Sequence, residues 1–188
     1  ILPKDIGSLK RDVLMLASLG ARKKTDFECG WPMLYAYASV SERFVFSGMG
    51  ADGHFCISKK GLLHYKHRID EFRRVTFSNP GYAQQPLHKR LASRFGKTAV
   101  LPYVSKEMQA VFRGKSWDEV NRPRQKQPIL DAFPREFSRI KVQSHTNLQL
   151  GDSGIADHFR RLLSSDWNTG GWKSPVGIYN AVVTGRLM

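Results

Sequence analysis

The residues of this chain best suited to chemistry lie in one glycine-rich segment, Ser47 to Gly53. A run of β-forming residues ends at Phe46, so the sequence predicts a strand that leads directly into a turn. Glycines at 48 and 50 let backbone amides approach an anion with no side chain in the way. Such amides can form a concave site for phosphate oxygens, and the neighbouring Asp52 is suited to bind a Mg²⁺ ion that bridges phosphates. The segment therefore predicts a polyphosphate site.

Two other interpretations of these glycines exist. As a bare pattern, Gly48, Gly50 and Gly53 match the phosphate loop of dinucleotide-binding folds. That fold needs a helix starting at the loop and then a second parallel strand, and residues 54–61 have the pattern of neither, so we set this interpretation aside. A tight turn with a purely structural role is the plainer alternative, and it stays open.

The segment Phe46 to Gly53 resembles the Ser-Gly-Glu-Gly-Ala-Asp-Glu motif of the asparagine synthetase family, which includes the β-lactam synthetases. Three later segments resemble that family in the same order: Leu101 to Tyr103, Asn121 to Leu130 with its Lys126, and Lys141 to Ile155. The order holds over about residues 6–165. The resemblance implies an α/β, helix-rich fold with few parallel strands: the C-terminal portion of an adenine-nucleotide alpha-hydrolase-like (PP-loop) synthetase domain. Residues 166–188 would form a C-terminal extension.

The family activates a carboxylate by attack on the α-phosphate of ATP, which releases pyrophosphate, and an amine then displaces AMP. The resemblance therefore implies ATP and Mg²⁺ as cofactors. It implies that Ser47, Gly48 and Gly50 face the phosphates and that Asp52 is a metal ligand. Lys126 would be the cation that neutralises the pyrophosphate leaving group, and Asp52 and Lys126 would be the catalytic pair. Such transfers depend on charge stabilisation more than on covalent help.

The chain also departs from the family pattern. Met49 and Gly53 stand where the motif has its two glutamates, and the family's earlier Ser-Gly-Gly-x-Asp-Ser loop does not occur in the sequence. The main prediction is an ATP-dependent, AMP-forming carbon–nitrogen ligase or amidotransferase that takes its ATP loop from an N-terminal segment or a partner chain. The alternatives are a non-catalytic descendant of this fold that binds nucleic acid, and an enzyme that modifies nucleic acid.

The composition favours polyanionic ligands. Thirty Lys and Arg residues against sixteen acids give a net charge of +14, which attracts nucleic acid, nucleotides or pyrophosphate. Two isolated cysteines do not make a zinc site or a disulfide framework, and a reducing cytoplasm is the expected location. Since no apolar run approaches 20 residues, the sequence predicts no membrane-spanning helix.

Hydrophobic periodicity predicts the elements that must position the loop. A buried strand is expected over residues 42–46, a loop over 47–61 and a short β segment over 98–104. Ser105 is expected to cap a helix whose Met108, Val111 and Phe112 face inward. The other expected helices span residues 3–19, 32–40, 84–95, 126–133 and a stretch that begins at 152 or 153.

Overall fold

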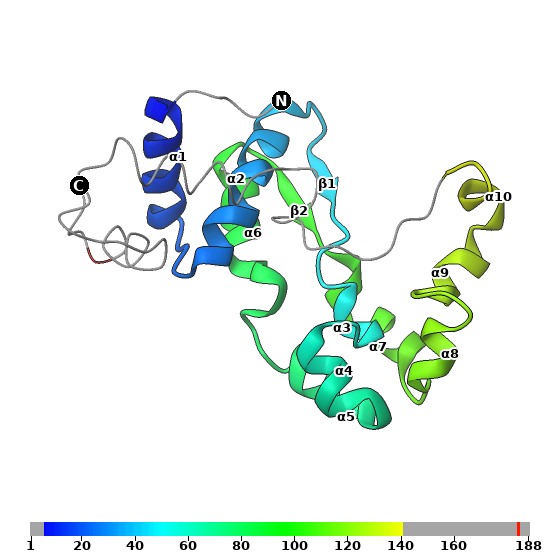
Figure 1. Cartoon of the computed structure of the whole chain (residues 1–188). Helices are drawn as coiled ribbons and strands as arrows, with labels where there is room; N and C mark the ends of the chain where they lie inside the picture. Colours follow the sequence, from blue (N-terminus) through cyan, green and yellow to red (C-terminus); the bar gives the residue numbers. More distant parts are fainter. Residues whose placement is uncertain (1–5, 141–183, 185–188) are drawn as a thin grey trace. The chain divides into compact units, whose positions relative to one another are not determined.

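The structure of the protein is a computed structural model of the whole chain, and it describes residues 6–140 and residue 184 (Figure 1). The chain divides into two compact units. Within the described residues, unit 1 contains residues 6–45, 84–99 and 184, and unit 2 contains residues 46–83 and 100–140. The predicted helix after residue 152 and the predicted extension 166–188 lie outside the described residues.

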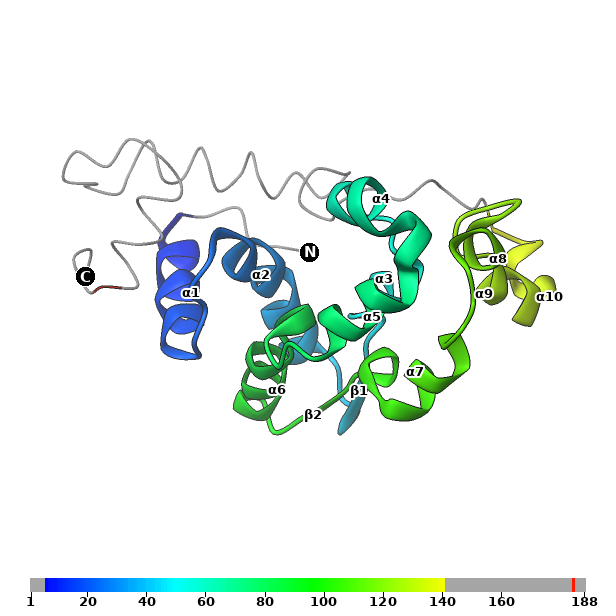
Figure 2. The ribbon, with the colours of Figure 1, turned by 90° about the horizontal axis from the view of Figure 1, so that it is seen from below.

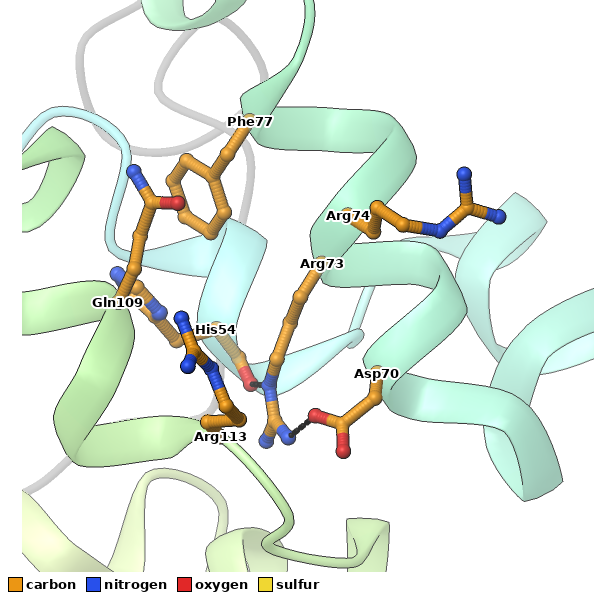
Figure 3. A pocket seen from close by; sticks show the side chains of 7 residues that line it. All are labelled: His54, Asp70, Arg73, Arg74, Phe77, Gln109 and Arg113. Atoms are coloured by element: carbon orange, nitrogen blue, oxygen red, sulfur yellow. Dashed lines mark hydrogen bonds and ion pairs between the residues drawn. The ribbon is translucent and has the colours of Figure 1, made fainter. Parts of the chain in front are cut away.

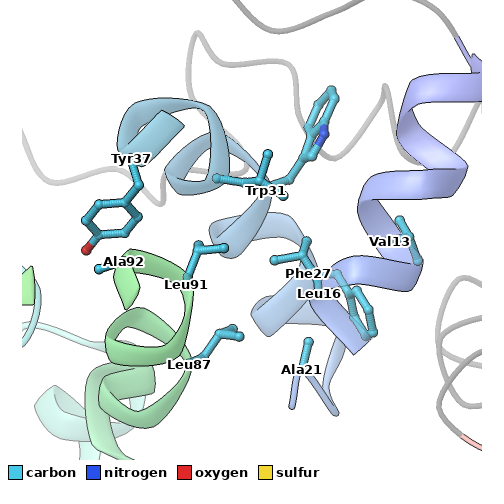
Figure 4. Close-up of a cluster of buried hydrophobic side chains, with 10 residues drawn as sticks. Val13, Leu16, Ala21, Phe27, Trp31, Tyr37, Leu87, Leu91 and Ala92 are labelled. Carbon is cyan, nitrogen blue, oxygen red and sulfur yellow. The ribbon is translucent and has the colours of Figure 1, made fainter. Parts of the chain in front are cut away.

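The described residues of unit 1 form three helices around one apolar cluster. They are α1 (Ile6–Ser18), α2 (Lys24–Ser39) and α6 (Gln85–Arg94). Figure 4 shows side chains from all three helices meeting in this cluster, with α2 contributing the large aromatic rings. The predicted periodicities of α1 and α6 are confirmed where side chains are described, because Val13, Leu16, Leu87 and Leu91 are all buried. Gly20 follows the first helix with a φ of 99°, the left-handed conformation that commonly terminates a helix.

The prediction that the second helix starts at Pro32 is wrong. Helix α2 begins eight residues earlier, at Lys24, and Pro32 lies inside it. Asp26 explains the early start, because its carboxylate accepts hydrogen bonds from the amides of Arg22 and Lys23 at 2.9 and 3.0 Å. Burial of the Phe27 ring stabilises the turn before the proline. Tertiary packing thus outweighs the hydrogen bond that an internal proline removes.

The sheet has two parallel strands, β1 (Phe44–Phe46) and β2 (Thr98–Val100). The amide of Thr98 donates to the carbonyl of Arg43 at 2.8 Å, and the amide of Ser47 donates to the carbonyl of Val100 at 3.0 Å. The expectation of a buried first strand is wrong: Phe44 is 54% exposed and Phe46 is 72% exposed. Among the described residues, one strand pairing alone does not cover both faces of β1. The expected helix-rich α/β class with few parallel strands is confirmed.

Unit 2 contains mostly short helices. They are α3 (Asp52–Phe55), α4 (Lys59–Tyr65), α5 (Ile69–Phe77), α7 (Lys106–Phe112), α8 (Trp117–Asn121), α9 (Gln127–Ala132) and α10 (Pro134–Phe137). Three 3-10 turns accompany them: η1 (Lys66–Arg68), η2 (Tyr82–Gln84), which ends at the start of unit 1, and η3 (Pro102–Val104). Figure 2 shows α3, α4 and α5 close together, and α5 packs on both of the others. The buried apolar cluster of unit 2 takes Phe55 from α3, Ile69 from α5, Phe112 from α7 and Val120 from α8, together with Cys56 and Ile57.

Several predicted details of unit 2 are confirmed and others are wrong. Ser105 caps α7, and its hydroxyl accepts from the amide of Met108 at 3.1 Å. Phe112 is buried as expected, but Val111 is 59% exposed, because a seven-residue helix has room for one narrow apolar face. The predicted loop 47–61 is interrupted by α3, whose four residues are too few to show a period in the sequence. Among the described helices, none is long and apolar enough to cross a membrane.

Candidate functional site

The glycine-rich loop of unit 2 starts where β1 ends. The Ser47 amide is held by the carbonyl of Val100, and the Ser47 hydroxyl accepts a hydrogen bond from the amide of Met49 at 3.3 Å. The Ala51 amide then donates to the carbonyl of Gly48 at 3.2 Å, which closes the turn that leads into α3. Within residues 6–140 the amides of Gly48 and Gly50 donate no hydrogen bond. These two N–H groups are therefore free to bind an anion.

The two glycines are required for different reasons. Gly50 has a φ of 91°, and a Cβ there would lie 2.6 Å from Cγ1 of Val104, so neither the backbone conformation nor the space admits a side chain. A Cβ on Gly48 would meet nothing within 4 Å. The loop is thus packed on its Gly50 side and open on its Gly48 side, which is the side from which a ligand could approach.

Asp52 and Lys126, which are far apart in the sequence, come together at this loop. Nζ of Lys126 lies 2.9 Å from Oδ1 of Asp52. The side chains are 46% exposed for Asp52 and 32% exposed for Lys126, so solvent and solutes can reach both. The structure therefore brings the two residues predicted as the catalytic pair into direct contact. Asp52 directly follows the turn that runs from Gly48 to Ala51.

The backbone of Lys126 adopts a left-handed conformation, with a φ of 64° and a ψ of 32°. This conformation is costly for a residue with a Cβ. Asn121 holds it in place: its buried side chain accepts from the Lys126 amide at 3.4 Å and donates to the carbonyl of Phe55 at 2.8 Å. Asn121 thereby ties the lysine to the end of α3, the helix that begins at Asp52.

Asn121 is a positioning residue that the sequence analysis did not identify. The only signal for it was its place at the start of the segment that contains Lys126.

Tyr82 contacts the loop through a hydrogen bond, and the sequence analysis did not identify it as a residue of the site. Its hydroxyl donates to the carbonyl of Gly50 at 3.2 Å. Burial, with a further contribution from the nearby Asp52 carboxylate, raises the pKa of Tyr82 to about 12, so the phenol stays protonated. A Cβ on Gly53 would lie 2.7 Å from the Tyr82 hydroxyl and 2.9 Å from Cζ of Phe77. This packing excludes a second acidic side chain at position 53 and leaves Asp52 as the carboxylate of the loop.

His54 is buried beneath the loop rather than exposed beside it. Its ring stacks on Phe112 with the centroids 4.4 Å apart, and Nε2 donates to the carbonyl of Tyr103 at 2.6 Å. Burial lowers the pKa of His54, and the nearby Arg73 guanidinium lowers it further, against the opposing effect of the Tyr103 hydrogen bond. The ring is therefore neutral near pH 7.

The arrangement suits a magnesium-bound polyphosphate. Magnesium typically takes one or two protein carboxylates and completes its octahedron with phosphate oxygens and water, so one accessible aspartate is sufficient. The described residues contain no group of three or more His, Cys, Asp or Glu side chains placed to hold a metal by themselves. Asp52 would hold the ion, and Lys126 and the two free amides would face the phosphate oxygens. Comparisons with protein-family models, curated proteins and solved structures found no match for this chain.

Proposed function

We propose that unit 2 binds a magnesium-bound polyphosphate at the Asp52–Lys126 pair, as part of an asparagine-synthetase-like, PP-loop ligase that forms AMP. The ligand would be ATP in the adenylating step and pyrophosphate as its product. An N-terminal segment or a partner chain would supply the second ATP-gripping loop. The two cysteines are free thiols, which agrees with a protein of the reducing cytoplasm.

The observation that carries the proposal is the ion pair itself. A carboxylate and an ammonium lie 2.9 Å apart, and both are partly exposed. The loop that leads to Asp52 contains two amides, those of Gly48 and Gly50, that donate no hydrogen bond within residues 6–140. A carboxylate can hold a cation, while an ammonium and free amides can hold anionic oxygens. A magnesium-bound polyphosphate carries both kinds of charge, so it can replace the internal ion pair without leaving either side chain unpaired.

Each residue then has a chemical role. When bound, Mg²⁺ supplies positive charge that offsets the negative charge of the phosphates. Lys126 neutralises charge on the leaving pyrophosphate, a contribution on the order of 10²–10³-fold in rate for one such contact. Gly48 and Gly50 orient phosphate oxygens through their amides. Asn121 and Tyr82 contact no substrate, and they hold Lys126 and the loop in position.

The test is calorimetric binding of magnesium pyrophosphate to the full chain. We expect binding that Asp52→Ala and Lys126→Met each weaken about tenfold or more, because each removes a charged contact. Glu71→Ala and Arg68→Met are the matched controls, since they break an exposed ion pair of the same unit at 3.0 Å. Equal binding by all four variants would refute the site. Exchange of labelled pyrophosphate into ATP, lost in Asp52→Ala, would then test adenylation.

A non-catalytic descendant of the fold that binds nucleic acid is the second candidate. It is favoured by Met49 and by the packing against Gly53, which together leave the loop with one carboxylate where the resembling motif has three. The net charge of +14 suits a nucleic-acid ligand. Binding to single- and double-stranded RNA should then weaken steeply between low and moderate salt. Affinity that does not change with salt would exclude this candidate.

A further inference from the structure

Unit 2 contains a cavity that His54 helps to line. It has a volume of about 330 Å³, and its walls come from α3, α5 and α7 and from the residue that follows α7. Three arginines contribute to it, Arg73, Arg74 and Arg113. Figure 3 shows the guanidinium groups of Arg73 and Arg113 near His54, while Arg74 extends away from them. Neither Asp52 nor Lys126 lines this cavity.

Arg73, which helps to line this cavity, has an unused donor. The residue is only 6% exposed. Its Nε donates to the carbonyl of His54 at 3.0 Å, and its Nη1 donates at 2.7 Å both to Asp70 and to the carbonyl of Lys115. Its Nη2 is buried and has no hydrogen-bond partner within the described part of the chain. Buried polar groups are rarely left without a partner, least of all charged ones, so an occupant that accepts a hydrogen bond is expected here.

His54 presents an unused acceptor. Because Nε2 faces a carbonyl oxygen, which can only accept, Nε2 carries the ring hydrogen. In this tautomer Nδ1 has a lone pair, and it too is buried without a partner in the described residues. The side chain itself is fully buried, so the acceptor is fixed in place by the aromatic rings on either side. An occupant that satisfies both groups must therefore accept a hydrogen bond from Arg73 and donate one to His54.

The charges around the cavity favour an anion. Asp70 compensates one arginine: its Oδ1 lies 2.7 Å from Nη1 of Arg73, and its Oδ2 accepts from the amide of Gly114 at 2.9 Å. With both of its oxygens engaged, the carboxylate does not compete for the other guanidinium groups. Three arginines and one aspartate line the cavity, so the lining carries a surplus of positive charge that favours an anion.

We propose that this cavity binds the terminal phosphate of a small phosphorylated molecule. A phosphate monoester that keeps one proton offers oxygens to Arg73 and Arg113 and an O–H group to Nδ1 of His54. A phosphodiester has no such proton, and sulfate is fully deprotonated at neutral pH. The volume is at the lower end of small-molecule sites, so a phosphate with a small organic part fits, and Phe77 forms an apolar wall for that part. This site extends beyond the proposed ligase function and does not depend on it.

The test is calorimetric titration of the full chain with inorganic phosphate, sulfate and dimethyl phosphate, in the presence of EDTA so that no magnesium site contributes. We expect phosphate to bind about tenfold or more tightly than either of the other anions, since a buried acceptor left unpaired is costly. Arg113→Gln should weaken phosphate binding about tenfold. Arg135→Gln is the matched control, because it removes an exposed arginine of the same unit outside the cavity.

Further variants separate the explanations. His54→Phe should abolish the preference for phosphate over sulfate, with circular dichroism used to show that the variant is folded. The ligase proposal is tested by the binding of magnesium pyrophosphate to Lys126→Met, and this one by the binding of phosphate to Arg113→Gln, so a failure of either proposal is distinguishable from a failure of the other. The proposal is overturned if phosphate does not bind, if Arg113→Gln binds it like the unaltered chain, or if sulfate binds equally well. Equal binding of dimethyl phosphate overturns it in favour of a nucleic-acid backbone.

Discussion

Replacement of Lys126 tests whether this residue contributes to the stability of unit 2 or to the binding of a ligand. Lys126 holds a left-handed backbone conformation and a half-exposed ion pair at the same time. If the lysine were there for stability, glycine would be the better residue at this position. We therefore compare Lys126→Gly, which relieves the backbone and removes the side chain, with Lys126→Ala, which removes the side chain alone.

The expected changes in the free energy of unfolding are small. An exposed ion pair contributes about 0.2–1 kcal/mol, so Lys126→Ala should lose no more than that amount. Relative to alanine, glycine gains about 1–2 kcal/mol from the left-handed conformation and loses about 0.5–1 kcal/mol to the greater freedom of the unfolded chain. The glycine variant should therefore be about 0–1.5 kcal/mol more stable than the alanine variant.

Both variants should nevertheless lose affinity for magnesium pyrophosphate about 10- to 100-fold, because a hydrogen bond to a charged group contributes about 1.5–3 kcal/mol. Urea denaturation followed by circular dichroism gives the stabilities, and titration calorimetry gives the affinities. Asn121→Ala should lower both the free energy of unfolding and the affinity for magnesium pyrophosphate. The substitution removes the side chain that holds the Lys126 backbone, and it leaves the carbonyl of Phe55 without its donor.

Two outcomes would contradict this reasoning. A loss of more than about 2 kcal/mol in Lys126→Ala would mean that the lysine is a structural residue, since exposed pairs do not contribute so much. Unchanged affinity for magnesium pyrophosphate in both variants would mean that its ammonium contacts no ligand.

Other measurements test the loop and the two cores. Gly50→Ala should destabilise unit 2 by about 1–3 kcal/mol, since its Cβ would lie 2.6 Å from a valine methyl group, whereas Gly48→Ala should be nearly neutral; thermal melts of the pair check this. Asp12→Ala should cost about 1–3 kcal/mol in urea titrations, because the buried carboxylate accepts from a tryptophan and a tyrosine of α2. Burial lowers the pKa of His54 and of His88, so unfolded chains bind protons that folded ones do not, and the free energy of unfolding should fall as the pH drops below about 6.5. The fall should be smaller in His88→Gln, and a pH-independent stability would contradict the assigned burial.

Local signals in the sequence determined much of the scaffold. A left-handed glycine at the end of α1, the serine cap of α7 and the apolar spacing of α6 each act over one or two helical turns, so they can be read from neighbouring residues. The expectation of a glycine turn directly after a strand is confirmed for the same reason. Prediction failed where distant packing outweighed a local rule, as in α2, which continues through Pro32 because Phe27 and Trp31 are buried against the other helices of unit 1.

The composition of the site was decided only by the tertiary structure. Resemblance to a family suggested Asp52 and Lys126, but no periodicity relates two residues that far apart, and it is the path of α3, α8 and α9 that brings their charges to 2.9 Å. Tyr82 had no signal of its own in the sequence, and neither had the groups of Arg73 and His54 that lack a partner in the described residues. A hydrogen bond between distant segments forms only when the fold brings the two segments together. The type of an amino acid does not determine which residue will be its partner.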